Sequence, residues 1–300
     1  MIANTNVDVI ARPVEAIPPP GTEHLVDRIE MRVGGAGGIT ALALAALGIK
    51  PRLIACIGGD LLGSLVREEL RAGGVPVDDV TVMTEMGTAV SIAMEAPVHD
   101  RSFLISLACL ALFGEGAVPE GALHANAVMV GGYFLAPRLR AVPTNGLLRT
   151  AKESGARTFF DTGWDPDGWR PSTRSEIRSL LPLVDFFLPN LDEAIAISGS
   201  RDAEAAARTL QRISGGAVVV KLGAGGCIAL ASDASVIRRA APKVDLVDST
   251  GGGDAFNAGL IAGLADGANL TEAVDMAVRV GTAVVSRPSS NRYPRREELG

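Results

Sequence analysis

A run of three glycines between two aspartates carries the most chemical information in this sequence. Asp248-Ser-Thr-Gly-Gly-Gly-Asp254 leads into Ala255–Leu264, whose small and apolar residues predict a closely packed helix. Before a helix, Gly251, Gly252 and Gly253 allow several backbone N–H groups to converge on one point, where the helix N-terminus adds partial positive charge. The segment therefore predicts a cradle for a phosphate group.

Asp254 distinguishes this cradle from a simple anion-binding loop, because a fixed carboxylate would repel a phosphate that merely binds. A kinase needs a carboxylate at such a place, to take the proton of the attacking hydroxyl. The alternative interpretation is that Asp254 is only the N-cap of the following helix. The spacing alone leaves both open.

Two smaller groups of residues near the start could contact a ligand. Gly34 and Gly35 precede a helix predicted over Ile39–Leu47, and allow either close approach to a ligand or only a tight turn. Asn6 and Asp8 are two residues apart, so a strand would point both to the same side. A carboxylate is a good acceptor for neighbouring hydroxyl groups. The alternative for Asp8 is a cap at a strand end.

Two motifs in the second half of the chain have both a ligand and a structural interpretation. Asn190 and Glu193 offer the oxygen ligands that Mg²⁺ prefers, and their spacing is also that of a helix capping box. Lys221-Leu-Gly223-Ala-Gly-Gly226 follows a buried strand, and as a bare pattern it predicts only a hairpin turn.

Short apolar runs alternate with helix-like runs through most of the chain. Strands are predicted over Val128–Gly131, Thr158–Asp161, Phe186–Pro189, Ala217–Leu222 and Val244–Val247, and a surface helix over Asp202–Ile213. This alternation predicts βαβ units and a mostly parallel sheet with helices on both faces. Ligands bind such sheets at the carboxyl ends of the strands.

Two segments, approximately residues 9–33 and 88–107, differ from this pattern. Glu30–Val33 alternates like a half-exposed strand, and the second segment reads as two strands around a turn near residues 99–101. Together they predict a small β-lid, which would exclude water from activated phosphate. The alternative is two ordinary surface hairpins.

These motifs resemble, in the same order, those of the ribokinase family, also called the PfkB carbohydrate kinases. Asp248–Gly259 is similar to the C-terminal signature, with Ser249 and Gly252 in place of Thr and Ala. The resemblance covers nearly the whole chain. It implies one ribokinase-like domain over residues 1–300, with an α/β fold and the lid. It also implies transfer of the ATP γ-phosphoryl group to a hydroxymethyl group of a sugar or sugar-like molecule, with Asp254 as base.

The resemblance further implies which residues bind each ligand. For the acceptor they are Asn6, Asp8, Gly34 and Gly35. For the nucleotide they are Asn190, Lys221, Gly223, Gly226 and Thr250. Mg²⁺ is expected near Asn190 and Glu193, held mostly through water. In some relatives a monovalent cation such as K⁺ binds with Asp248, beside a last strand and turn that is expected here over Val284–Pro288.

Three places depart from the family pattern. Gly163, two residues after Asp161, stands where relatives often carry an Asn, which bears on contact with phosphate. On the acceptor side, Ile39 also stands where relatives often carry Asn, and Ser106–Leu110 is apolar where relatives often have Gly-Ala-Asn. The acceptor pocket is therefore expected to be less polar than in a typical sugar kinase. A nucleoside kinase on the same fold is the nearest alternative, because a flat base suits apolar surroundings.

A non-catalytic metabolite-binding member is a more distant alternative, which the lost Asn positions motivate. The intact Asp254, Asn190 and Glu193 favour a kinase instead. An oxidoreductase is disfavoured because no Gly-x-Gly-x-x-Gly opens an early βαβ unit.

Composition limits the classes of partner and the cellular location that are expected for this protein. A net charge of −6 without a long basic run disfavours nucleic acid. No apolar run is long enough to span a membrane. Three cysteines without metal-type spacing indicate reduced, buried thiols, and no signal peptide is recognised, so a cytoplasmic location is expected. A homodimer through the lid is implied by the resemblance only.

Overall fold

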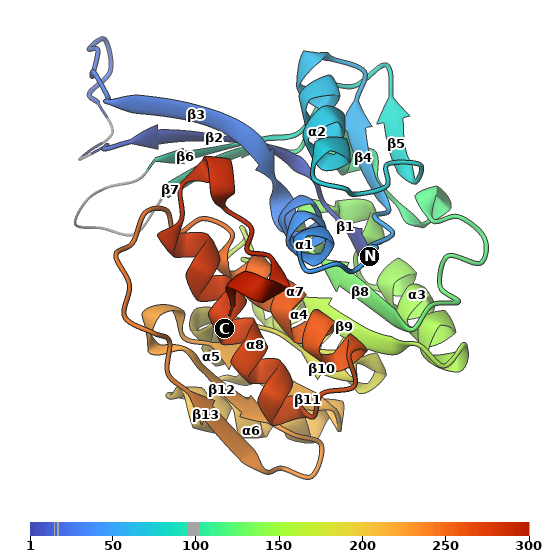
Figure 1. Ribbon diagram of the computed structural model, residues 1–300. Helices are drawn as coiled ribbons and strands as arrows, with labels where there is room; N and C mark the ends of the chain where they lie inside the picture. Colours follow the sequence, from blue (N-terminus) through green and yellow to red (C-terminus); the bar gives the residue numbers. More distant parts are fainter. Residues whose placement is uncertain (15, 17, 95–101, 300) are drawn as a thin grey trace.

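The computed structural model describes residues 1–14, 16, 18–94 and 102–299 (Figure 1). The large sheet contains β1 (Ile2–Ala3), β8 (Ala127–Gly131), β9 (Arg157–Asp161), β10 (Phe186–Phe187), β11 (Ala217–Lys221), β12 (Cys227–Leu230) and β13 (Val236–Arg239). The second sheet contains β2 (Asn6–Arg12), β3 (Arg28–Gly34), β6 (Val90–Met94) and β7 (Ser102–Ser106). A separate pair is formed by β4 (Ala55–Gly58) and β5 (Val80–Met83).

The helices are α1 (Gly35–Ala46), α2 (Leu61–Ala72), α3 (Val142–Glu153), α4 (Pro171–Leu180), α5 (Leu191–Ser198), α6 (Ala203–Ser214), α7 (Gly252–Ala265) and α8 (Leu270–Ser286). Helices α1 to α6 lie between these strands in the chain, and α7 and α8 follow the last strand. The predicted strands over 128–131, 158–161 and 217–222 and the helix over 202–213 are therefore confirmed to within a residue or two.

The large sheet is mostly parallel. Its order in the described part of the chain is β1-β8-β9-β10-β11-β12-β13, and each pairing from β1 to β11 is parallel, whereas β12 and β13 are antiparallel. The predicted mostly parallel central sheet is confirmed. Its carboxyl edge carries the ends of β9 and β11, where ligands of such sheets bind.

Helices cover both faces of this sheet, and the alternation of its side chains shows how. Phe159 of β9 packs in the apolar cluster that contains residues of α1, α7 and α8. The next residue, Phe160, packs in the opposite cluster with residues of α4, α5 and α6. Successive strand residues point to opposite faces, so both faces are buried, as Figure 1 shows for α7 and α8 in front of the sheet.

The helix after the glycine run packs unusually closely against α8. A Cβ at Gly259 would lie 2.8 Å from the Ala277 Cα, and one at Gly263 would lie 2.9 Å from the Ala273 Cα. Larger residues at either position would push the helices apart. The predicted close packing of 255–264 is confirmed, and it fixes the position of the α7 N-terminus.

The second sheet is built from the two segments that differ in the sequence. β2 pairs with β3 antiparallel and with β6 parallel, and β7 pairs with β6 antiparallel. The turn predicted near residues 99–101 lies outside the described residues. In Figure 1 this sheet extends away from the large one.

Three local predictions were wrong. Val244–Val247 is not a strand; this segment is irregular, and the Val247 N–H bonds to the Val285 carbonyl. Val284–Pro288 is not a strand and turn, because α8 continues to Ser286. Phe186–Pro189 forms a strand only at its first two residues. In the first and third cases a short, mostly apolar run has no period that separates a strand from other structure. The second prediction followed from the family resemblance.

Within the described part of the chain, no helix combines the length and the apolar character that crossing a membrane requires.

Candidate active site

The glycine run forms the N-terminus of α7. Gly251 is the N-cap, with a left-handed φ of 73° that glycine adopts at little cost, and no side chain caps the helix there. The N–H groups of the first turn have no intrahelical partner, so they are available to an anion. Asp254 lies inside this turn. The alternative interpretation of Asp254 as the N-cap is therefore wrong.

A buried polar network adjoins the cradle at the carboxyl ends of β9 and β11. Lys221 donates from Nζ to Asp161 Oδ2 at 2.7 Å and to Asn257 Oδ1 at 3.3 Å. Asn257 in turn donates to the same Asp161 oxygen. A Cβ at Gly253 would lie 3.6 Å from Lys221 Nζ, so the ammonium group lies next to the glycine run. A cation there would attract a phosphate held by the cradle.

Asp254 has the electrostatic properties of a base that works near neutral pH. Burial, the largest cause, and the negative charge of Asp161 raise its pKa from 3.8 to about 7. The positive charge of Lys221 opposes this rise. A base is most effective when its pKa lies near the working pH. Its backbone is fixed as well, because Thr40 Oγ1 donates to the Asp254 carbonyl at 3.2 Å.

Asn190 and Glu193 form a reciprocal capping box at the start of α5. Asn190 Oδ1 accepts from the Glu193 N–H at 2.9 Å, and Glu193 Oε2 accepts from the Asn190 N–H at 2.9 Å. The structural interpretation is thus confirmed. The capping box is compatible with a ligand at the same residues. Asn190 forms a parallel β-bridge with Lys221 at the end of β11, so the pair lies beside the same polar network.

The residues around Glu193 fit a divalent cation held mostly through water. Burial, followed by the negative charge of Asp161, raises the Glu193 pKa from 4.5 to about 8, and the charge of Asp254 adds to this. A cation would relieve this excess of negative charge. Among the described residues, no group of three or more His, Cys, Asp or Glu side chains is arranged to hold a metal ion. Such a sparse donor set suits Mg²⁺, which keeps several waters.

Asn6, Asp8, Gly34 and Gly35 lie together where β2 pairs with the end of β3. Asn6 Nδ2 donates to Asp8 Oδ1 at 2.8 Å, so the predicted common side is confirmed. A Cβ at Gly34 would lie 2.1 Å from the Asp8 Cγ, and one at Gly35 would lie 2.6 Å from the Asn6 Oδ1. Both positions require glycine, because a Cβ at either one would overlap the side chain of Asp8 or Asn6. Asp8 lies within β2, so the alternative interpretation of Asp8 as a cap at a strand end is wrong.

The pKa of Asp8 depends on charged residues near the glycine run. Its burial raises its pKa to about 6, while Arg32 and Arg292 oppose the rise and Asp248 adds to it. The Asp8 carboxyl group is therefore coupled electrostatically to the charged residues around Asp248.

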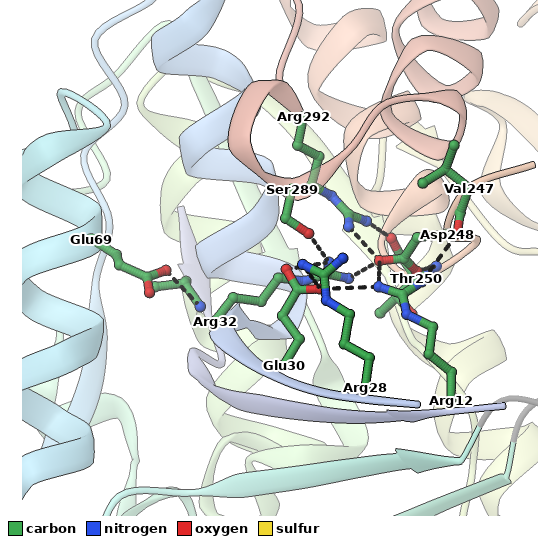
Figure 2. A network of polar contacts seen from close by, with 11 residues as sticks. Arg12, Arg28, Glu30, Arg32, Glu69, Val247, Asp248, Thr250, Ser289 and Arg292 are labelled. Atoms are coloured by element: carbon green, nitrogen blue, oxygen red, sulfur yellow. Dashed lines mark hydrogen bonds and ion pairs between the residues drawn. The ribbon is translucent and has the colours of Figure 1, made fainter. Parts of the chain in front are cut away.

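An arginine cluster joins the second sheet to the loop before the cradle. Figure 2 shows the side chains of Arg12, Arg28 and Arg32 reaching from β2 and β3 toward Asp248. Arg32 forms an ion pair with Asp248 Oδ2, and Arg12 Nη2 lies 3.8 Å from the same oxygen. The guanidinium groups of Arg292 and Arg32 hold the pKa of Asp248 well below its usual range despite its burial.

The remaining predicted nucleotide residues lie in two places. Gly223 and Gly226 form the turn between β11 and β12, so the hairpin interpretation is confirmed. A Cβ at Gly226 would lie 1.9 Å from the Arg239 carbonyl, which explains why glycine is needed. Thr250 is buried immediately before the glycine run, and its N–H donates to Asp248 Oδ1 at 2.8 Å.

Residues 1–296 match the pfkB family of carbohydrate kinases. The chain belongs to this family. Its members phosphorylate alcohol groups, and the chain is accordingly an ATP-dependent carbohydrate kinase.

Curated members of the pfkB family resemble the chain over most of its length. It is 30% identical to the 2-dehydro-3-deoxygluconokinase of Thermoproteus tenax, over 91% of this chain and 85% of that protein. It is 25% identical to the nucleoside kinase of Methanothermobacter thermautotrophicus, over 95% and 88%. The named relatives thus include both sugar and nucleoside kinases.

Solved structures agree on the fold. A protein described as ribokinase II from Escherichia coli, in complex with ATP and Mg²⁺, has a TM-score of 0.86 at 22% identity, covering 99% of this chain and 96% of that one. The ribokinase of Thermotoga maritima has a TM-score of 0.80 at 22% identity, with the same coverage. The predicted ribokinase-like fold is confirmed.

Sequence reasoning assigned no role to Asn257, Arg32 or Arg292, which contact the predicted site residues. Asn257 could have been found, because it is a polar residue in an apolar helix, three positions after Asp254 and so on the same face. Neither arginine gives such a signal. Cys109, expected near the acceptor, is fully buried in an apolar core cluster.

Proposed function

We propose that the chain transfers the γ-phosphoryl group of ATP to a hydroxymethyl group of a sugar or sugar-like molecule, with Asp254 as general base. The observation that carries this proposal is the position of Asp254 in the first turn of α7, directly after the glycine run, with a pKa raised to about 7. A base and an anion cradle one residue apart suit attack of a hydroxyl on a bound phosphate.

In this mechanism each group has one task. Asp254 accepts the proton of the attacking hydroxyl. The N–H groups of Gly251, Gly252 and Gly253 stabilise the charge that develops on the transferring phosphoryl group. Lys221 lies beside Gly253 and adds a positive charge at the same place.

Acceptor and nucleotide lie on opposite sides of Asp254 in this proposal. Asp8, with Asn6 held against it, accepts hydrogen bonds from acceptor hydroxyls, and Gly34 and Gly35 allow the acceptor to approach the backbone. The nucleotide is bound by Asn190, Lys221, Gly223, Gly226 and Thr250.

The proposal includes Mg²⁺ near Asn190 and Glu193, where it would neutralise phosphate charge. The negative charge that raises the Glu193 pKa to about 8 supports this assignment. The resemblance also implies K⁺ at Asp248. That carboxylate already pairs with the guanidinium groups of Arg292 and Arg32, which would repel a further cation, so K⁺ is not included.

The second sheet acts as a lid in this proposal, within one domain of residues 1–300. Its inner face carries Asp8 and Arg32, which pair across β2 and β3. Closure over the acceptor would exclude water from the phosphate.

A homodimer through the outer face of this lid is proposed as well. Register places Met31, Val9, Ile92 and Leu104 in one row across its four strands. Met31 and Leu104 are 56% and 59% exposed, so the row offers an apolar strip. The matching strip of a second copy would bury it.

A screen of acceptors tests the proposed function. Purified protein with ATP and Mg²⁺ is incubated with neutral sugars, sugar acids and nucleosides, and ADP release is measured. We expect turnover with at least one sugar or sugar acid, which Asp254→Asn lowers by about 10³-fold. Turnover with nucleosides alone would favour the alternative of a nucleoside kinase. ADP release that no acceptor stimulates would favour a non-catalytic, metabolite-binding role.

A further inference from the structure

The carboxylate of Asp248 is already bonded to protein groups on both oxygens. Oδ1 accepts from the Thr250 N–H at 2.8 Å, and Oδ2 accepts from Arg292 Nη1 at 2.8 Å. Arg32 forms a second ion pair with Oδ2. Asp248 and Arg292 are each 3% exposed, so this ion pair is shielded from water. Buried carboxylates of this kind need such partners.

Arg292 also bonds to the backbone of the cradle. Its Nη2 donates to the Thr250 carbonyl. In a trans peptide the C=O and the following N–H point in opposite directions. A carbonyl held toward Arg292 therefore directs the Gly251 N–H away from it. A Cβ at Gly251 would lie 3.4 Å from Arg292 Nη2, so the guanidinium packs against the backbone of the cradle. Figure 2 shows Arg292 directed toward Asp248 and Thr250.

The groups that Arg292 contacts are those that a bound K⁺ would require. A monovalent cation is held by carboxylate and carbonyl oxygens, and here the Asp248 carboxylate and the Thr250 carbonyl both face one guanidinium. The guanidinium carries the same single charge. A further cation would be repelled by Arg292 and by Arg32, which contacts the same carboxylate. The residues present do not fit a bound K⁺.

We propose that the Arg292 guanidinium is a built-in monovalent cation that fixes the Thr250–Gly251 peptide and makes the phosphate cradle independent of K⁺. This inference rests on the proposed function of the cradle as a phosphate site. Arginine stays protonated at any pH that an enzyme meets. The cradle would therefore remain in place whatever the salt, and Arg292 acts as a positioning residue.

A purely structural role for Arg292 predicts a different outcome. The ion pair could serve only to attach the C-terminal segment, in which case its loss would lower stability and leave nucleotide affinity unchanged. Arg296 provides a matched control on the same segment, because its guanidinium also contacts an aspartate, Asp266, and a carbonyl, that of Leu47. That pair lies elsewhere, at the turn after α7.

The experiment measures ADP binding by calorimetry, so it needs no acceptor. Full-length wild type, Arg292→Ala, Arg292→Lys and Arg296→Ala are titrated with ADP and Mg²⁺ in potassium, sodium or tetramethylammonium chloride at equal ionic strength. Thermal unfolding is followed in the same buffers. We expect wild type and Arg296→Ala to bind ADP equally in all three salts. Arg292→Ala should bind about tenfold more weakly without K⁺, the loss of one charged hydrogen bond, and K⁺ or dilute guanidinium should restore part of it.

Three results would overturn the inference. The first is wild-type ADP affinity that depends on K⁺, and the second is wild-type affinity in Arg292→Ala. The third is weak binding by Arg292→Ala that no cation restores, since Arg292 would then act through packing. If Arg292→Ala does not fold, the salt series on wild type and Arg292→Lys still tests the inference. Both proteins keep the positive charge, so the ADP affinity of both should be independent of K⁺. Absence of ADP binding by wild type in every salt would instead contradict the proposed phosphate site.

Discussion

Lys221 Nζ lies 2.7 Å from Asp161 Oδ2, although the two residues are 60 positions apart. This one cation connects the carboxyl ends of β9 and β11 and lies beside the glycine run at the start of α7. Its charge opposes the rise in the pKa of both Asp254 and Glu193. The protonation of the proposed base therefore depends on a residue from another part of the fold.

Lys221→Met should lower turnover by about 10²-fold, since it removes a fixed charge from the site of phosphoryl transfer. It should also raise the pH below which activity is lost, because the pKa of Asp254 would rise further. The measurement is kcat against pH with the acceptor found by the screen. Lys152→Met is the control, because Lys152 forms a half-exposed ion pair with Asp185. Equal pH profiles for wild type and Lys221→Met would contradict this role.

Asp254→Asn should lower kcat by about 10³-fold while ADP binding is retained, because a neutral amide cannot accept the proton. In wild type, kcat/KM should rise with pH and level off above the Asp254 pKa of about 7. The variant's residual activity should lack this dependence. Near-normal turnover in the variant would remove Asp254 as the base.

The stability of the ligand-free protein should fall as pH rises toward 8. Glu193 has a folded pKa of about 8 against an ordinary value of 4.5, so between these values the folded state binds more protons than the unfolded state. Stability decreases with pH wherever this holds. Glu193→Gln cannot ionise, so its melting temperature should fall less between pH 6 and 9 than that of wild type, as followed by thermal unfolding.

Glu272→Gln is the matched control for this prediction, because Glu272 forms the same kind of capping box with Asn269 at an exposed helix start. Between pH 6 and 9, the melting temperature of Glu272→Gln should fall as much as that of wild type. A parallel fall for wild type and Glu193→Gln would show that Glu193 is ionised in the folded protein at neutral pH.

Gly34→Ala should destabilise the fold by about 3 kcal/mol, because the new methyl group overlaps the Asp8 carboxyl group. The overlap follows from the 2.1 Å between a Cβ at this position and the Asp8 Cγ. Gly146→Ala is the control: this exposed residue of α3 has nothing within 4 Å of a Cβ, and alanine should stabilise the helix by about 0.5–1 kcal/mol. Denaturant unfolding measures both. Equal stabilities would mean that Asp8 is free to move aside.

Leu104→Asp should convert the proposed dimer to a monomer, since a charge would be buried in the apolar strip of the second sheet. Light scattering after size exclusion measures the mass. Leu61→Asp changes a leucine that is 84% exposed at the start of α2, outside this sheet, and should leave the mass unchanged. A wild-type monomer, or a Leu104→Asp dimer, would exclude this interface.

Much of the site was recognisable from the sequence because its signals are local. Gly251–Gly253 and the helix after it, and the Asn190 capping box, depend on neighbours within one turn of chain. The strand and helix alternation that predicted the parallel sheet is likewise read from short windows. Val244–Val247 was misread for the same reason, since four residues, three of them apolar, have no period to test.

The sequence by itself therefore determined the fold class and the glycine run that begins a helix, and it predicted the cradle and the base. Only the tertiary structure decided which charges surround them. Arg292 reaches Asp248 across 44 positions, and Arg32 reaches it from the opposite end of the chain. These pairs depend on how the second sheet and the segment after α8 pack around one loop. Sequence spacing does not predict such packing, because these contacts form between secondary-structure elements and not within them.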